Sequence, residues 1–190
     1  MRIEEIDSFL VHHWYLVRIR TDNGITGWGE TAFWGYPDAS ERIVQYFRKY
    51  LLGQDPLRIE HHWQYLYRFS HFKGAAIGSA LSAVDIALWD IKGKYYQAPV
   101  WELMGGKTRD KVRLYMHVNG ETPEALAESA RKAVQQGFTA VRFAPFTQEF
   151  YNLRFDQLID EGVKRVAAVR EAVGTGVDIC VEIHRRLSIP

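Results

Sequence analysis

The stretch VDICVEIH, residues 177–184, alternates apolar and polar side chains. Successive side chains of a β-strand point to opposite faces, so the pattern predicts a strand with one apolar and one polar face. Glu182 and His184 share the polar face, and a carboxylate beside an imidazole can form part of a metal and acid–base site. A half-buried antiparallel strand with a solvated face shows the same alternation, so an ordinary solvated pair is the alternative.

The residues before this stretch alternate between strand and helix patterns. Thr122-Pro123 is a helix cap followed by proline, and Gly137 ends the helix that it begins. Strand, helix, strand, helix, strand in this order is typical of a parallel sheet covered by helices. The expected strands are 112–117, 138–143 and 177–184, and the expected helices are 124–136 and 156–173.

The first half of the chain follows a different pattern. Asp22-Asn23-Gly24 is a tight-turn signal between two predicted strands, which indicates an antiparallel meander. Helical segments follow, and polar residues 107–110 form the best domain boundary. We therefore expect one domain at 1–110 and another at 111–190. The expected strands of the first domain are 3–11, 14–20 and 25–30, and its main helices are 39–52, 56–69 and 75–94.

Composition argues against several kinds of partner. The 190 residues carry 24 Lys and Arg against 23 Asp and Glu, and this net charge of +1 gives no reason to expect a nucleic acid or a membrane partner. The sequence shows no apolar signal core and no apolar run of membrane-spanning length. The single cysteine, Cys180, cannot form an internal disulfide, which fits a reducing compartment. We expect a cytoplasmic protein.

Two predicted loops carry candidate substrate-binding residues. His12, His13 and Trp14 connect the first two strands, and Trp34 and Tyr36 follow the third. Aromatic side chains in loops can line a pocket or a subunit contact. His12 and His13 can equally be two exposed turn histidines.

Three blocks of the sequence carry a family resemblance. They are VRIRTDNGITGWGE (17–30), SAVDIALWDIKGK (82–94) and PVWELMGG (99–106). Together they resemble the capping domain of the enolase superfamily, in its mandelate racemase and muconate lactonizing branch. The resemblance implies an α+β N-terminal capping domain, made of a three-stranded antiparallel meander plus helices, followed by the first part of a (β/α) TIM-type barrel. In that family the substrate is enclosed between the two domains.

The resemblance also implies roles for the closing stretch. In the family, the end of the third barrel strand supplies the first of the carboxylates that hold Mg²⁺, and Glu182 falls at that place. His184 is similar to the histidine that acts as general acid in the acid-sugar dehydratases of the branch. Barrel enzymes have their active sites at the carboxyl ends of their strands, and this pair lies at such an end. Mg²⁺ prefers hard oxygen ligands and an imidazole titrates near neutrality, so the residue types fit.

The second barrel strand separates alternatives within the branch. Many racemases and cycloisomerases place a Lys-x-Lys base there, but residues 141–145 read Val-Arg-Phe-Ala-Pro, and arginine is a poor base. We therefore expect a lyase similar to the galactonate and mannonate dehydratases, which removes the proton α to a carboxylate and then the β-hydroxyl of a sugar acid. Arg142 can bind a substrate carboxylate, support a tyrosine base such as Tyr151, or form a structural ion pair.

The other metal carboxylates that the family uses do not fall within these residues. An open three-stranded parallel sheet also exposes a face and an edge. We expect the chain to be an inactive piece of a longer, homo-oligomeric enzyme. A racemase, epimerase or cycloisomerase of the same superfamily is one alternative, and a non-catalytic or remnant member is another.

Overall fold

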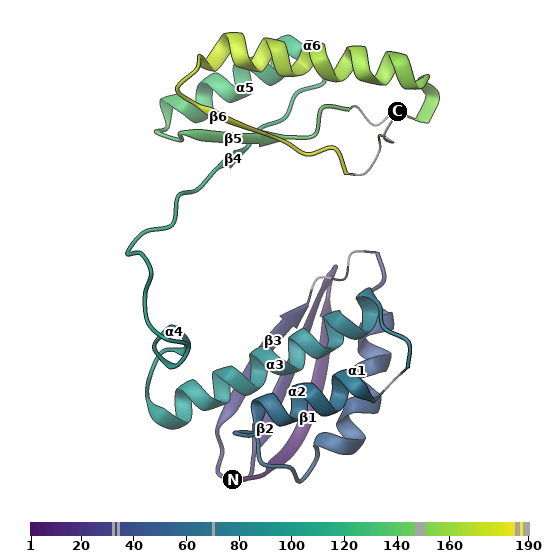
Figure 1. Cartoon of the computed structure of the whole chain (residues 1–190), viewed down its shortest axis with the longest axis vertical. Helices are drawn as coiled ribbons and strands as arrows, with labels where there is room; N and C mark the ends of the chain where they lie inside the picture. The colour runs from purple at the N-terminus through teal and green to yellow at the C-terminus, as the bar shows by residue number, and fades with distance from the viewer. Residues whose placement is uncertain (32, 34, 70, 147–150, 185–186, 188–190) are drawn as a thin grey trace. The chain divides into compact units, whose positions relative to one another are not determined.

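The computed structural model describes residues 1–31, 33, 35–69, 71–146, 151–184 and 187. Contacts between Cα atoms divide the chain into two compact units, Met1–Thr108 and Arg109–Pro190 (Figure 1). The described part of the chain contains no helix long and apolar enough to cross a membrane.

The first unit contains an antiparallel sheet in the order β1-β2-β3. The turn between β2 and β3 is closed by the Thr21 amide, which donates to the Ile25 carbonyl at 2.9 Å, and Gly24 in this turn has a φ of 85°. A positive φ costs glycine little, which is why the turn forms here. The predicted meander is confirmed. Its strands are β1 (Ile3–Val11), β2 (Trp14–Thr21) and β3 (Thr26–Thr31).

Helices cover one face of this sheet (Figure 1). The second helix begins at Ile59 and not at Pro56 as expected, because Asp55 closes a turn first: its Oδ1 accepts from the Leu57 amide at 3.0 Å, and its carbonyl accepts from the Arg58 amide. Side-chain bonds of this kind compete with the helix. The helices are α1 (Pro37–Leu51), α2 (Ile59–Arg68), α3 (Ala75–Tyr96) and α4 (Val100–Leu103).

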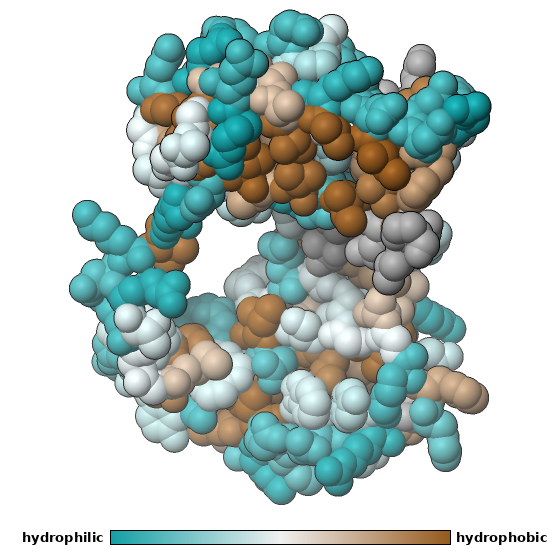
Figure 2. Space-filling model, turned by 45° about the horizontal axis from the view of Figure 1, so that its top comes forward, coloured by the Kyte–Doolittle hydropathy of each residue, from teal (hydrophilic) through white to brown (hydrophobic). Residues whose placement is uncertain are grey.

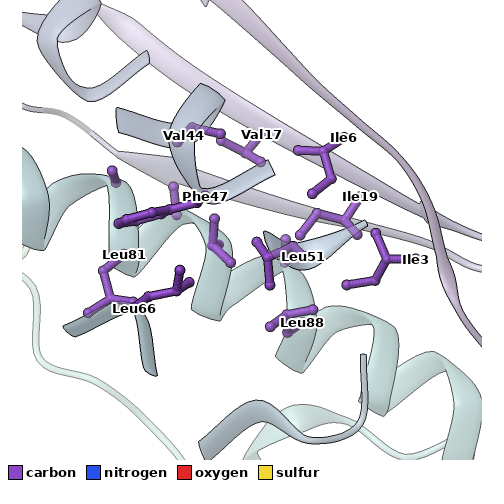
Figure 3. Close-up of a cluster of buried hydrophobic side chains, with 14 of the residues drawn as sticks. Ile3, Ile6, Val17, Ile19, Val44, Phe47, Leu51, Leu66, Leu81 and Leu88 are labelled. Atoms are coloured by element: carbon purple, nitrogen blue, oxygen red, sulfur yellow. The ribbon is translucent and has the colours of Figure 1, made fainter. Parts of the chain in front are cut away.

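One apolar core joins the sheet to its three long helices (Figure 3). The β2 strand contributes alternate residues, and α1 and α3 contribute residues spaced three or four apart, as the two periodicities require. The labelled core residues are Ile3, Ile6, Val17 and Ile19 from the sheet, Val44, Phe47 and Leu51 from α1, Leu66 from α2, and Leu81 and Leu88 from α3.

The α3 helix packs against β3 with almost no side chain between the two backbones. A Cβ atom at Gly29 would lie 1.8 Å from the Ala83 carbonyl oxygen, and one at Gly27 would lie 2.1 Å from that of Ala87. Glycine is therefore required at both positions, and the alternation places Trp28 between them on the opposite, exposed face.

His62 is a buried polar residue of this core, with 1% of its surface exposed. Its Nε2 lies 2.8 Å from the Asp55 carbonyl oxygen and its Nδ1 lies 3.0 Å from the Tyr50 hydroxyl. Burial lowers the pKa of His62 below its ordinary value of 6.5, so the folded chain keeps the ring neutral at a pH where the unfolded chain protonates it.

We predict that acid weakens the first unit through His62. Because the unfolded state binds the extra proton, stability is fully present above pH 6.5 and falls as the pH drops from there toward the lowered folded pKa. Urea unfolding of the wild type and of His62→Gln, at pH 7.5 and pH 5, measures this. The wild type should lose more stability on acidification than the variant does. Equal losses would assign the pH dependence to other groups.

The second unit contains a parallel sheet in the order β4-β5-β6, with α5 and α6 on one of its faces (Figure 1). Thr122 caps α5 as predicted, since its Oγ1 accepts from the Ala125 amide at 3.2 Å. Val141 and Phe143 of β5 are buried against the two helices. The predicted strand and helix order is confirmed. The elements are β4 (Met116–His117), α5 (Pro123–Gln135), β5 (Ala140–Phe143), α6 (Phe155–Val173) and β6 (Asp178–Val181).

All three strands of this sheet are shorter than the sequence pattern suggested, β4 and β6 most of all. Among the described residues, only Met116 and His117 of the expected 112–117 strand pair with β5. The third strand, β6, stops at Val181 and not at His184, although the Glu182 amide still donates to the Phe143 carbonyl at 2.9 Å. His184 then has a φ of 46°, so the chain has left the strand direction before this residue.

Candidate active site at the carboxyl ends of the parallel strands

The parallel sheet has one face toward its helices and one polar face. His117, Arg142 and Cys180 lie in register across the three strands, on the face opposite to Val141. Glu182 follows Cys180 by two residues and its side chain meets Arg142, so it belongs to the same face. The polar face therefore collects chemistry-bearing side chains at the carboxyl ends of the strands, where barrel enzymes react.

Arg142 is the centre of this cluster. One terminal nitrogen, Nη2, donates to Glu182 Oε2 in an ion pair, and the other, Nη1, lies 2.7 Å from His117 Nε2. The guanidinium carbon lies 5.8 Å from the centre of the Tyr115 ring. Because arginine only donates, His117 must accept at Nε2 and carry its proton on Nδ1. The ion pair matches one of the three predicted roles of Arg142.

Glu182 is held in its ionised form. The hydrogen bond from Arg142 lowers the pKa of Glu182, and the bond from the His184 amide adds to the effect. The same ion pair raises the pKa of Arg142. The Glu182 side chain is 34% exposed, so a ligand can reach it from solvent.

His184 comes to Glu182 by a turn and not, as the alternation suggested, from a continuing strand. Its amide donates to Glu182 Oε1 at 3.2 Å, and its Nε2 lies 3.7 Å from the same oxygen. The carboxylate and the imidazole are therefore neighbours as predicted. A turn of the backbone at His184 brings them together, and not the alternation of a continuous strand. The imidazole is half exposed, which leaves it free to contact a ligand.

A buried arginine positions the loop that follows β4. Arg165 of α6 is 3% exposed, its Nη1 donates to the Gly120 carbonyl at 2.9 Å and its Nη2 donates to the Glu121 carbonyl. Its Nε also donates to Glu161 at 2.8 Å, so the buried charge is paired. The loop next to His117 is thus fixed to the helix layer.

The remaining predicted site residues lie in loops or at the beginnings of strands and helices. Tyr151 lies between β5 and α6 and is 83% exposed, so its role as a base stays a prediction. His12 and His13 form the two-residue turn between β1 and β2, with His12 at a φ of 58°, and the exposed Trp14 begins β2. The exposed Tyr36 immediately precedes α1, whereas Trp34 lies outside the described residues.

Sequence reasoning did not identify His117. The signal was present, because His117 ends the first parallel strand and faces the same way as Arg142. The role of His117 is visible only in the structure, where the sheet register places its ring within hydrogen-bonding distance of the Arg142 guanidinium.

The donor set suits a hard cation but is incomplete. Glu182 offers an ionised carboxylate, the ligand type that Mg²⁺ prefers. Within the residues that the structure describes, no group of three His, Cys, Asp or Glu side chains could hold a metal ion. Glu182 therefore suits the role of one ligand in a larger metal site.

An antiparallel capping sheet with helices, followed by the opening strands of a (β/α) barrel that carry a carboxylate and a histidine, is the architecture of an enolase-type enzyme. A family model described as the mandelate racemase/muconate lactonizing enzyme N-terminal domain matches residues 8–105, and one described as the enolase C-terminal domain-like family matches residues 125–190. The chain belongs to the mandelate racemase/muconate lactonizing enzyme family, which confirms the resemblance seen in the sequence.

Known relatives agree with this placement. A D-galactonate dehydratase of Verminephrobacter eiseniae is 38% identical over 191 residues, which cover 100% of this chain and 50% of the relative. A Mesorhizobium loti structure described provisionally as a dehydratase superimposes with a TM-score of 0.88 at 33% identity, covering 97% of this chain and 53% of the other. The structure of a mandelate racemase/muconate lactonizing enzyme from Jannaschia sp. CCS1 superimposes with a TM-score of 0.86 at 31% identity. The match covers 99% of this chain and 55% of the other. The chain spans about half the length of these proteins.

Proposed function

We propose that residues 1–190 supply the cap and the first barrel strands of a Mg²⁺-dependent acid-sugar dehydratase. The observation that carries the proposal is the contact of His184 with Glu182 at the carboxyl end of β6, in a chain whose relatives include a D-galactonate dehydratase. Glu182 would be one carboxylate ligand of the cation, and the other ligands would come from later strands of the whole protein. When bound, Mg²⁺ offsets the negative charge that builds on a substrate carboxylate as the α-proton leaves.

His184 is the proposed general acid. In the dehydration, the α C–H bond breaks and its proton passes to a base, and the C–O bond to the β-hydroxyl breaks as that oxygen takes a proton and leaves as water. Histidine is the side chain that most often acts as a general acid in enzymes. The hydrogen bond from the His184 backbone amide to Glu182 fixes the imidazole beside the carboxylate. The general acid and the cation ligand would therefore approach one substrate together.

The surface of the second unit supports the proposal that the barrel continues. Apolar side chains of α6 and of the segment around β6 line a groove of about 580 Å³, and Figure 2 shows hydrophobic side chains gathered on the exposed surface of this unit. The groove lies beside the edge strand β6, and the edges of sheets are normally paired or covered. Further strands and helices of the whole protein would cover this groove. Representative lining residues are Phe146, Leu158, Val163, Val166, Val181 and Ile183.

The loops of the capping domain are the proposed specificity elements. His12, His13, Trp14 and Tyr36, together with Trp34, would contact the substrate from the cap. Specificity for one sugar acid over another then depends on these aromatic and imidazole groups, because polar sites reject analogues that leave their hydrogen bonds unmade. We further propose that the whole protein is a cytoplasmic homo-oligomer whose ligand is a small molecule.

A dehydration screen tests the proposed function. The whole protein is incubated with a panel of sugar acids, with MgCl₂ or with EDTA, and the 2-keto product is measured. We predict Mg²⁺-dependent dehydration of at least one acid, and no turnover by the isolated 190-residue chain. Epimerisation without loss of water would favour a racemase instead, and dehydration by the isolated chain would refute the view that it is incomplete.

A further inference from the structure

We propose that the outer face of α3 is a contact surface for a second copy of this protein, and that the two α3 helices meet antiparallel about a two-fold axis near Trp89. In this contact, Asp85 of each copy pairs with Lys92 of the other. The inference rests on the homo-oligomer of the proposed function and names one of its surfaces. Neither charged residue belongs to the candidate active site, so the dehydratase proposal does not depend on this contact.

The surface lies on the helix layer of the first unit. The α2 and α3 helices lie side by side on one face of the antiparallel sheet, and a hollow of about 720 Å³ lies between them (Figure 1). Asp85, Trp89 and Lys92 of α3 line this hollow. They follow one another at intervals of four and three residues, so they form one row along the helix.

Asp85 is half-buried, and within the described part of the chain no hydrogen bond or ion pair reaches its carboxylate. Burial raises the pKa of Asp85 above its ordinary value, and the negative charge of Glu60 adds to the effect. A half-buried carboxylate without a partner is costly. A cation brought to Asp85 from outside the chain would offset this cost.

Lys92 lies at the other end of the same row. Its Nζ lies 4.7 Å from the centre of the Trp89 ring, and among the described residues its ammonium forms no ion pair. Seven residues of α-helix span about 10 Å, so Asp85 and Lys92 of one chain are too far apart along α3 to meet. Each row therefore carries one unpaired negative charge and one unpaired positive charge.

A two-fold axis supplies both missing partners at once. A two-fold contact pairs residue i with j and j with i, so an axis midway between positions 85 and 92 brings each carboxylate to an ammonium of the other copy. Trp89 lies near the middle of this span, and Ile86, which is 45% exposed, adds apolar area beside it. An aromatic and apolar centre flanked by charges is the usual composition of a specific interface.

The order of the charges favours a second copy over a small ion. The hollow is lined by Glu60 and Asp85 together with Arg58 and Lys92, so a simple anion or cation would meet charges of its own sign there. A surface that carries the same two signs in reverse order would satisfy both ends of the row. The rotated copy of this face has that order.

Charge reversal and mixing test the pairing. Self-association of the 190-residue chain, of Asp85→Lys and of Lys92→Asp is measured by sedimentation equilibrium. Each variant alone places two like-charged pairs in the contact, so its dissociation constant should rise by about tenfold or more. In an equimolar mixture of the two variants, both pairs become attractive again, and heterodimers should form with close to the wild-type affinity.

Further variants control for folding and for net charge. The double variant Asp85→Lys/Lys92→Asp reverses both charges and should dimerise as the wild type does. Asp160→Lys and Lys111→Asp carry the same charge changes at exposed positions of the second unit. Alone or mixed, these two should associate like the wild type.

Three outcomes would overturn the inference. If both single variants associate as tightly as the wild type, the copies meet elsewhere, for example at the apolar groove of the second unit. If each variant weakens association and mixing does not restore it, the helices do not meet about a two-fold axis. If the chain stays a monomer of 22.0 kDa at every concentration, this face does not bind a second copy.

Discussion

Replacement of His184 by asparagine is expected to lower kcat for dehydration by the whole protein about 10²- to 10⁴-fold, the range that a positioned general acid contributes. Asparagine keeps the backbone amide that donates to Glu182 Oε1, so the carboxylate should stay in place. It cannot supply a proton at neutral pH. Steady-state rates together with a separate measurement of Mg²⁺ affinity give the result, which should be a loss in kcat with little change in cation binding.

His71→Asn is the matched control for this substitution. His71 is an exposed histidine of the first unit to which no site role is assigned, and its replacement should leave kcat within about twofold of the wild type, since surface changes of this kind are close to neutral. If His184→Asn retained the wild-type rate, the departing hydroxyl would take its proton from another group, and the acid role of His184 would be lost.

Replacement of Gly29 by alanine is expected to destabilise the capping domain by about 3 kcal/mol or more, the upper end of the cost of overpacking. The new Cβ atom would lie 1.8 Å from the Ala83 carbonyl oxygen and 2.8 Å from the Ala83 carbonyl carbon. Both atoms belong to the backbone of α3, so no rotation of a side chain relieves the clash. The helix must move away from the sheet, and its contacts with the core weaken together.

Gly78→Ala, in the α3 helix that packs against Gly29, provides the control. A Cβ atom at Gly78 meets nothing within 4 Å, and alanine is the better helix former by about 0.5 to 1 kcal/mol. Urea unfolding followed by circular dichroism should therefore show the two glycine-to-alanine changes moving stability in opposite directions. Equal stability of Gly29→Ala and the wild type would show that the close approach of α3 and β3 is not required.

Much of the fold could be predicted because its determinants are local. The turn at Gly24, the cap at Thr122 and the alternation of β2 and β3 each depend on residues that are close in sequence. Some consequences for distant contacts could also be anticipated. Asp90 lies inside an otherwise apolar helix, where a carboxylate needs hydrogen-bond partners, and its Oδ2 accepts from the Trp28 amide at 2.9 Å and from Lys94 at 2.7 Å.

The candidate site was less predictable because its geometry depends on register and on one unusual backbone angle. Nothing in the local sequence indicates that His184 adopts a φ of 46°, which is uncommon for a residue other than glycine. The Arg142 partners, His117 and Glu182, are contributed by two different strands and become neighbours only through the parallel pairing of β4, β5 and β6. Residue types could therefore be proposed from the sequence, but not their hydrogen bonds.

The position of a bound cation is the decisive measurement. Crystals of the whole protein grown with MnCl₂ in place of MgCl₂ would locate the ion by anomalous diffraction. We predict a peak within coordination distance of a Glu182 oxygen, with His184 beside it. A fully occupied ion bound elsewhere, with Glu182 still paired to Arg142, would contradict the assignment of Glu182 as a cation ligand and the dehydratase mechanism built on it.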